Sequence, residues 1–379
     1  MKIAFATPLA ATASTILGRT IPVAKELAAV GHDVHVLVLS GATQPTISDL
    51  TFHTIGNEPF IRTAAGKQRL SGLRLVSNML GSAWRMAWHL RKLQPDVVIL
   101  VKTLPTSVTG VWLWRLLGGR GRIILDMDDF ELAANHLSSI LQRAFVHLAE
   151  RRAIALADSI VVATPFLLDH AKQLAKPDQK VTLIPTGLST VDATDVTGDR
   201  LQLVYLGSIS LKSGHRVTLL PDILAKVRKH YPGLLLIMAG DGDDVQMLKN
   251  AFAKLNLETA VRWVGRFDAN HITSLLSTKT IIIDPVDSSI EARAKSSYRV
   301  AVATSLGLAV VTSNIGIRPT LLPESLHDRL FALPDDSQDY AKKIVNLCDT
   351  PLTDLEQLSL RNHSEQFTWE KLARQYISL

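Results

Sequence analysis

The chain has 379 residues, of which 47% are hydrophobic and 20% are charged. This composition excludes an intrinsically disordered chain, and the length predicts two domains rather than one core. A single cysteine, Cys348, excludes a disulfide framework, and the sequence contains no run of about 18 uncharged apolar residues that would predict a membrane-spanning helix.

The net charge of +6 is unevenly distributed along the chain. Residues 1–185 hold 20 Lys and Arg against 13 Asp and Glu, whereas residues 186–379 hold 21 against 22. The basic excess is concentrated between residues 59 and 125, a stretch that contains 11 basic residues and one acid, Asp96. A basic surface of this kind serves nucleic acid, acidic lipid or an anionic substrate.

Strand and helix patterns alternate along the whole chain, which predicts an α/β fold with parallel sheets. In the first half the predicted strands are 2–7, 34–39, 97–101, 123–125 and 159–163, and the predicted helices are 19–30, 73–93, 137–157 and 165–174. In the second half the predicted strands are 202–206, 234–239, 261–263, 281–284 and 309–312. The polar, turn-rich segment 186–198 is predicted to link a first domain (1–185) to a second one (199–365).

Glycines follow or precede several predicted strands of the second half. One strand runs into Gly207, the next into Gly240-Asp241-Gly242, and the last follows Gly307. Glycine lets backbone N–H groups approach a ligand closely, and a following helix N-terminus favours negative charge. These turns at one sheet edge predict a bound diphosphate.

Six segments occur in the same order as in a known family. The chain resembles the GT-B glycosyltransferases, and most closely glycosyltransferase family 4, in Gly31-His-Asp-Val34, Ala157-Asp-Ser-Ile-Val-Val-Ala163, Ile184-Pro-Thr-Gly187, Gly240-Asp-Gly242, Val264-Gly-Arg266 and Phe367-Thr-Trp-Glu370. The resemblance implies two Rossmann-like domains facing a cleft, with the C-terminal segment 366–379 as a helix that crosses back to the first domain. It also implies a nucleotide-sugar donor and catalysis that retains anomeric configuration without a metal.

The family's donor motifs are degenerate in this sequence. Ser208 stands where the family has an arginine, and Lys212 lies one residue before the position of the family's lysine. Val302 and Ala294 replace the two glutamates of the Glu-x7-Glu motif, so Glu291 becomes a candidate substitute. The resemblance implies a donor site that also includes Gly207, Gly240, Asp241, Arg266, Phe267, Ser296, Ser297 and Arg299. Arg299 with the two serines is predicted to clamp a phosphate through charge-assisted hydrogen bonds.

Three carboxylates at the end of strand 123–125 are the candidate catalytic groups. Asp126, Asp128 and Asp129 repel one another, which raises some of their pKa values unless a cation is near. The resemblance places Asp128 where the family has a histidine, and a carboxylate there is expected to polarise an acceptor hydroxyl as a base. Two other interpretations remain: an Asp-x-Asp site for Mg²⁺ or Mn²⁺, and an aspartate that caps a helix over 130–134. Arg19 is a candidate for a phosphate or acceptor contact.

The basic segment 62–122 also contains tryptophans. One interpretation is a solvated helix face with core aromatics; the other is docking on anionic lipid. The residues predicted to meet the membrane are Arg69, Arg74, Trp84, Arg85, Trp88, Arg91 and Lys92. Nucleic acid is disfavoured because no nucleic-acid-binding motif accompanies the charge.

The sequence therefore predicts a glycosyltransferase that moves a sugar from a nucleotide diphosphate to a lipid-linked or glycan acceptor at the cytoplasmic membrane face. Two alternatives stay open. Loss of both motif glutamates is compatible with a non-catalytic subunit that binds a partner glycosyltransferase, and a sugar-nucleotide epimerase would share the fold.

Overall fold

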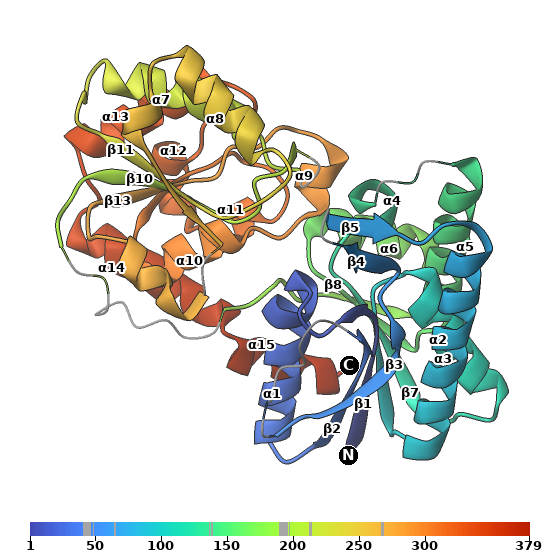
Figure 1. Cartoon of the computed structure of the whole chain (residues 1–379). Coiled ribbons are helices and arrows are strands. Elements are labelled where there is room, and N and C mark those ends of the chain that lie inside the picture. Colours follow the sequence, from blue (N-terminus) through green and yellow to red (C-terminus); the bar gives the residue numbers. More distant parts are fainter. Residues whose placement is uncertain are drawn as a thin grey trace. The chain divides into compact units, whose positions relative to one another are not determined.

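The protein is described by a computed structural model that covers residues 1–40, 47, 49–63, 66–135, 137, 139–188, 196, 198–211, 214–266 and 269–379. The chain forms two compact units (Figure 1). Unit 1 comprises Met1–Thr186 together with Trp369–Leu379, and unit 2 comprises Gly187–Thr368.

Unit 1 is built on a seven-stranded parallel sheet with the order β3-β2-β1-β6-β7-β8-β9. Its strands are β1 (Lys2–Ala10), β2 (Asp33–Ser40), β3 (Thr51–Asn57), β6 (Val97–Val101), β7 (Arg122–Met127), β8 (Ser159–Val162) and β9 (Lys180–Leu183). A separate antiparallel hairpin pairs β4 (Phe60–Thr63) with β5 (Gly66–Arg69). The central strand β6 has all five residues buried, as expected for a parallel sheet covered on both faces.

Helices cover both faces of this sheet. On one face, α2 (Gly72–Leu93), α3 (Pro105–Leu116), α5 (Ile140–Leu156) and α6 (Pro165–Leu174) pack through a core that includes Met86, Val111 and Ala153. The short helix α4 (Glu131–Ala134) precedes α5. On the other face lie the π-helix Ile16–Thr20, α1 (Ile21–Ala29) and α15 (Trp369–Ile377), which shares a core with α1 through Trp369 and Tyr376. The last helix of the chain therefore belongs to unit 1 (Figure 1).

Unit 2 contains a five-stranded parallel sheet with the order β12-β11-β10-β13-β14. Its strands are β10 (Gln202–Leu206), β11 (Leu235–Ala239), β12 (Val261–Gly265), β13 (Thr280–Ile283) and β14 (Ala309–Val311). Its α-helices among the described residues are α7 (Leu220–Arg228), α8 (Val245–Lys254), α9 (Ile290–Ala294), α10 (Tyr298–Leu306), α11 (Arg318–Leu321), α12 (His327–Leu330), α13 (Ser337–Asp349) and α14 (Asp354–Ser364). Short 3₁₀ turns lie at Val217–Leu219, Glu258–Ala260, Ala269–Leu275, Glu324–Leu326 and Glu365–Phe367.

The predicted α/β class with two parallel sheets is confirmed, and each predicted strand is present with its ends shifted by a few residues at most. Sequence reasoning did not predict β3, whose burial is partial and irregular because it is an edge strand. It also missed α3, which begins at Pro105 and is apolar on most sides. No helix among the described residues is both long and apolar enough to cross a membrane.

Candidate active site

The carboxyl ends of β6 and β7 carry a group of charged side chains. Lys102 follows the wholly apolar β6, and Asp126 lies near the end of β7, ahead of Asp128 and Asp129. The backbone of Lys102 has a φ of +64°, a left-handed conformation that costs a non-glycine residue about 1–2 kcal/mol. Gln94, Asn256 and Asp335 share this conformation outside the cluster, so the strain at Lys102 is compatible with a functional site but does not identify one.

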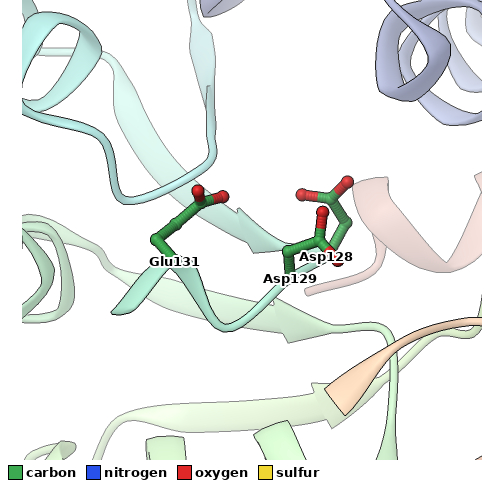
Figure 2. Close-up of side chains that lie close together, drawn as sticks. All are labelled: Asp128, Asp129 and Glu131. Carbon is green, nitrogen blue, oxygen red and sulfur yellow. The ribbon is translucent and has the colours of Figure 1, made fainter. Parts of the chain in front are cut away.

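The ammonium of Lys102 lies among three carboxylates. Its Nζ is 2.9 Å from Asp128 Oδ1, 2.9 Å from Asp129 Oδ2 and 2.9 Å from Glu131 Oε1. It donates hydrogen bonds to Asp129 and Glu131, whereas Asp128 Oδ1 is in ionic contact without a directed hydrogen bond. Figure 2 shows the three carboxylates gathered at the turn after β7. Lys102 is only 6% exposed, so the cluster is largely removed from water.

Burial and mutual repulsion shift the pKa values of this cluster. Burial is the largest influence on Asp128 and, with repulsion from Asp129 and Glu131, outweighs the attraction of Lys102, so the pKa of Asp128 rises to about 6. Burial by itself would lower the pKa of Lys102, but the three carboxylates raise that pKa well above its ordinary value. The sequence-based prediction attributed raised aspartate pKa values to repulsion between carboxylates. For Asp128 the larger cause is burial, which that prediction did not include.

The other two interpretations of the aspartates can be compared with this geometry. Asp128, Asp129 and Glu131 each offer an oxygen within 4.8 Å of the others, as a metal site would require. Lys102, however, already supplies a cation to these same oxygens, so the donor set does not fit a divalent ion in this arrangement. The interpretation of an aspartate as the N-cap residue is wrong, because the N-cap residue of α4 is Phe130.

Asp126 and Arg19 form a second buried network in unit 1. The Nε of Arg19 donates to both carboxylate oxygens of Asp126 at 3.0 Å, and its Nη2 donates to Asp126 Oδ1 at 2.8 Å and to the carbonyl oxygen of Ile184 at 3.0 Å. The hydroxyl of Tyr376 in α15 donates to Asp126 Oδ2 at 3.0 Å. Arg19 and Asp126 thus attach the C-terminal helix to the sheet, and a role for either in catalysis or acceptor binding stays a prediction.

In unit 2 two of the three predicted glycine turns, those at Gly207 and Gly240, lie next to each other. The prediction is wrong for Gly307, which ends α10 ahead of β14 and therefore lies at the amino edge of the sheet. An added Cβ on Gly240 would lie 1.8 Å from the carbonyl oxygen of Gly207, so only glycine fits there. The backbone N–H of Gly207 donates to the carbonyl oxygen of Ala239 at 2.8 Å. Ser208 accepts a hydrogen bond from the Tyr205 hydroxyl through its backbone oxygen, and the side chain of Asp241 accepts one from the Gly242 N–H. Two backbone turns therefore meet at the carboxyl edge of β10 and β11.

Glu291 lies against the loop that follows β10. An added Cβ on Gly214 would lie 3.1 Å from Glu291 Cβ, which places α9 beside that loop. Arg266 is exposed after β12. Lys212 and Phe267 fall outside the described residues.

Arg299 and Ser297 share a buried partner that sequence reasoning did not identify. The carboxylate of Asp284, at the end of β13, accepts hydrogen bonds from Arg299 Nε at 3.1 Å, Ser297 Oγ at 3.0 Å and Arg318 Nε at 2.6 Å. Arg299 is 3% exposed and stacks over the ring of Tyr205, with its Cζ 4.4 Å from the ring centroid. Its Nη1 donates to the carbonyl oxygen of Leu206 at 3.2 Å, and a phosphate contact by Arg299 stays a prediction. Val302 is fully buried in α10, and Ser296 precedes the N-cap of that helix.

The predicted membrane residues gather on α2, apart from Arg69, which ends β5 and whose side chain lies outside the described residues. Trp84 and Trp88 are exposed on α2, and the Lys92 Nζ lies 5.5 Å from the ring centroid of Trp88. Arg85 is exposed while its Nε donates to the carbonyl oxygen of Ile55 at 2.7 Å. Arg91 donates to the carbonyl oxygen of Leu117, and Arg74 is exposed near the start of the helix. Trp84 and Trp88 are therefore not core aromatics, whereas Trp114 in the same basic segment is 2% exposed and belongs to the core, as the other interpretation expects.

Sequence reasoning missed Lys102, Glu131 and Asp284. Two of them carry a recognisable signal, because each is a charged residue directly after an apolar strand of a parallel sheet. At that edge a parallel α/β sheet places its functional side chains. Glu131 had no such signal, since its pairing with Lys102 depends on the tertiary structure.

Two family profiles match the chain. Residues 19–187 match "Glycosyl transferase 4-like domain", and residues 200–350 match "Glycosyl transferases group 1". A phosphatidylinositol N-acetylglucosaminyltransferase subunit of Arabidopsis thaliana is 21% identical over 64% of this chain and 52% of its own length, so the chain spans about half of that relative. A glycogen synthase of Mycobacterium tuberculosis is 25% identical over 76% of this chain and 72% of its own.

Solved structures agree with the fold. Anabaena HepE in complex with UDP and glucose has a TM-score of 0.75 at 15% identity, covering 100% of this chain and 98% of that one. At this identity the likeness establishes the GT-B fold alone. The two profile matches, which lie one in each half of the chain, establish the family: this chain belongs to the group 1, or family 4-like, glycosyltransferases.

Proposed function

We propose that this protein transfers a sugar from a nucleotide-diphosphate donor to a lipid-linked acceptor at the cytoplasmic face of a membrane. The observation that carries the proposal is the buried Lys102 cluster with Asp128, at the carboxyl edge of the unit 1 sheet. Family membership supports the reaction class, and the cluster supplies a group suited to it.

Unit 2 is the proposed donor-binding part. The turns at Gly207 and Gly240 lie together at one sheet edge, where glycine lets the backbone approach a diphosphate closely. The N–H groups of these two glycines are bonded to backbone carbonyls, so the donor contacts are assigned to neighbouring residues of the turns. HepE was solved with UDP and glucose, which supports a sugar nucleotide as the donor. Arg266, Lys212 and Glu291 are the side chains proposed to replace the family's usual donor contacts, since Val302 is buried and apolar.

Unit 1 is the proposed acceptor-activating part, with Asp128 as the base. With a pKa of about 6, the Asp128 carboxylate is ionised at neutral pH and can accept the proton of an acceptor hydroxyl. The acceptor oxygen then bonds to the anomeric carbon on the same face from which the diphosphate departs, so the configuration is retained, and the nucleoside diphosphate leaves as that carbon–oxygen bond breaks. Asp129 and Glu131 anchor Lys102, whose ammonium keeps Asp128 in position. We propose that retention of configuration and independence from metal ions, which the family resemblance implies, also hold here.

A lipid acceptor is supported by the basic helix α2 and by one relative. That relative is named for transfer of N-acetylglucosamine to phosphatidylinositol, a membrane lipid. In α2, Arg74 and Lys92 lie in a helix that contains no acid and exposes Trp84 and Trp88, a composition typical of helices that lie on anionic bilayers. Synthesis of a cell-envelope glycan or polysaccharide is the proposed setting.

A second candidate is a non-catalytic subunit that binds a partner glycosyltransferase. The buried Val302 and Ala294 at the positions of both motif glutamates favour it, because neither side chain can bind a ribose or a sugar hydroxyl. The same relative is named as a subunit of a transferase. A sugar-nucleotide epimerase is disfavoured by the basic, aromatic face of α2.

One assay separates these functions. The purified chain is incubated with a panel of sugar nucleotides and vesicles of bacterial lipid extract, and melting shifts, donor hydrolysis and glycolipid products are measured. Transfer that is lost in Asp128→Asn and kept in Asp178→Asn, an exposed aspartate of the same unit, supports the enzyme. Binding without transfer supports the subunit, and epimerised nucleotide supports the epimerase. No melting shift with any nucleotide contradicts the transferase and the epimerase.

A further inference from the structure

The N-terminal end of α5 exposes an apolar surface that the proposed function has not used. Residues 139–145 are all exposed, and the first buried side chain of the helix is Val146. Ile140 is 86% exposed and Phe145 is 62% exposed, and Leu141 and Leu148 are exposed beside them. The six residues before Val146 correspond to about 9 Å of helix. Water contact of three large apolar side chains on this projection, with Leu148 one turn further along, is unfavourable, so a partner is expected to cover them.

This projection lies at the same sheet edge as the Lys102 cluster. Gln179, just before β9, donates to the carbonyl oxygens of Ile154 and Ala157, which places the C-terminal end of α5 at the amino edge of the sheet. The N-terminal end of α5 therefore lies at the carboxyl edge, where Lys102 and Asp128 are located. The short α4, which begins at Glu131 of the cluster, leads into it.

The N-terminal end of α2 lies at this edge as well. Asn78 donates to the carbonyl oxygen of Asn57, the last residue of β3, while Arg85 further along α2 donates to that of Ile55. The exposed Leu73 and Val76 of α2 are thus at the carboxyl edge, with α3 packed between α2 and α5. Two apolar helix ends flank the candidate active site of unit 1.

The charge of α2, α3 and α5 identifies the partner. Helices α2, α3 and α5 contain eight basic residues and one acid, Glu150. Glu150 is buried and lies 3.2 Å from His170 Nε2, so its charge does not face the solvent. The basic residues are Arg74, Arg85, Arg91, Lys92, Arg115, Arg143, Arg151 and Arg152. Five of these cations lie toward the C-terminal ends of the helices, whereas the exposed Arg74 and Arg143 lie beside the apolar side chains at the carboxyl edge. Residues 72–85 of α2 and 140–149 of α5 contain no acid, and apolar side chains beside exposed cations match a bilayer of anionic lipid.

We infer that the N-terminal end of α5 inserts into an anionic bilayer as an apolar anchor beside the active site. Its length of about 9 Å matches the depth of about 5–10 Å to which interfacial helices enter the headgroup and acyl boundary. Anchored at this edge, the Lys102 cluster faces the headgroups, where a lipid-linked acceptor presents its hydroxyl. The inference rests on the proposed function, because that function gives the anchor its purpose. Vesicle binding can nevertheless be measured whether or not the protein transfers a sugar.

The test uses the full chain with vesicles of phosphatidylglycerol and phosphatidylcholine in sedimentation assays. We expect Leu141→Glu/Phe145→Glu to lower the vesicle partition coefficient at least about tenfold, since it removes apolar insertion and adds negative charge. The matched control is Leu355→Glu, a 79% exposed leucine of α14 in unit 2, which we expect to bind like the parent. Thermal unfolding confirms that each variant is folded.

A second readout locates the insertion directly. In a Cys348→Ser background, a polarity-sensitive fluorophore on Phe145→Cys shifts to the blue with anionic vesicles, while the same label on Leu355→Cys does not. Parent-like vesicle binding of the double variant, or a label at 145 that stays in water, overturns the inference. A parent dimer that Phe145→Glu dissociates, without vesicle binding, also overturns it. A melting shift with sugar nucleotides, measured without vesicles, tests the proposed function separately. Failure of the membrane inference can therefore be distinguished from failure of the proposed function.

Discussion

Replacing Lys102 with methionine tests whether its ammonium holds the carboxylate cluster together. The substitution keeps most of the side-chain volume but leaves Asp128, Asp129 and Glu131 without the cation that lies 2.9 Å from each. Removing one partner of a buried ion pair typically costs about 3–5 kcal/mol, because a charge stays buried without compensation. We expect Lys102→Met to lose that much free energy of unfolding at pH 7, measured by urea denaturation.

Three comparisons sharpen this prediction. The exposed Lys172→Met in α6 is the matched control and should change the free energy of unfolding by under about 0.5 kcal/mol. Lys102→Gly should be at least as destabilising as Lys102→Met, because relief of the strain at φ +64°, about 1–2 kcal/mol, is outweighed by the cavity that replaces the buried side chain, about 2–5 kcal/mol. The deficit of Lys102→Met should shrink as the pH falls, since protonation neutralises the carboxylates. A loss below about 1 kcal/mol at pH 7, unchanged by pH, would refute the reasoning.

Three further predictions concern pH and packing. Because the pKa of Asp128 is raised from 3.8 to about 6, its contribution to stability is fully present below pH 3.8 and is lost as the pH rises through 6. At 1.36 kcal/mol per pKa unit, the free energy of unfolding falls by at most about 3 kcal/mol over this pH range. The free energy of unfolding of Asp128→Asn, measured at the same pH values, should lack this fall. Burial opposes ionisation of Asp284, but Arg318 and Arg299 lower its pKa, so its stabilising effect is present at neutral pH and lost in acid. Asp284→Ala should therefore cost about 3–5 kcal/mol in urea at pH 7, and a neutral result would show that the two arginines find other partners. Gly240→Ala should abolish sugar-nucleotide melting shifts or unfold unit 2, because the added Cβ would overlap the Gly207 carbonyl, whereas Gly233→Ala meets nothing within 4 Å and serves as its control.

Much of the fold follows from local sequence patterns. Apolar runs such as Val97–Val101 and Leu235–Ala239 are buried on both faces of parallel sheets, so the pattern and the structure agree. The glycines at 207 and 240 were also predictable, since their turns need close backbone approach. The edge strand β3 lacked a signal because half-exposed edge positions tolerate polar residues such as Thr51 and Asn57.

The candidate site was predicted only in part. The acidic turn after β7 stood out as a cluster of charges in sequence, but its cation did not, because Lys102 is 26 residues away from Asp128 and the two meet only when β6 pairs with β7. Arg299 was expected to face a phosphate, yet its nearest opposite charge is Asp284 from the end of β13. Pairing between charges distant in sequence depends on strand order, which no local pattern contains.

The pH dependence of sugar transfer tests the central claim most directly. With a sugar nucleotide that the chain binds and a lipid-linked acceptor, kcat/KM should rise with pH to a plateau above about pH 6, as the Asp128 carboxylate becomes available as the base. That rising limb should vanish in Asp128→Asn together with most of the activity. A profile that is flat from pH 5 to 7 in the parent, or an unchanged limb and rate in Asp128→Asn, would contradict Asp128 as the base.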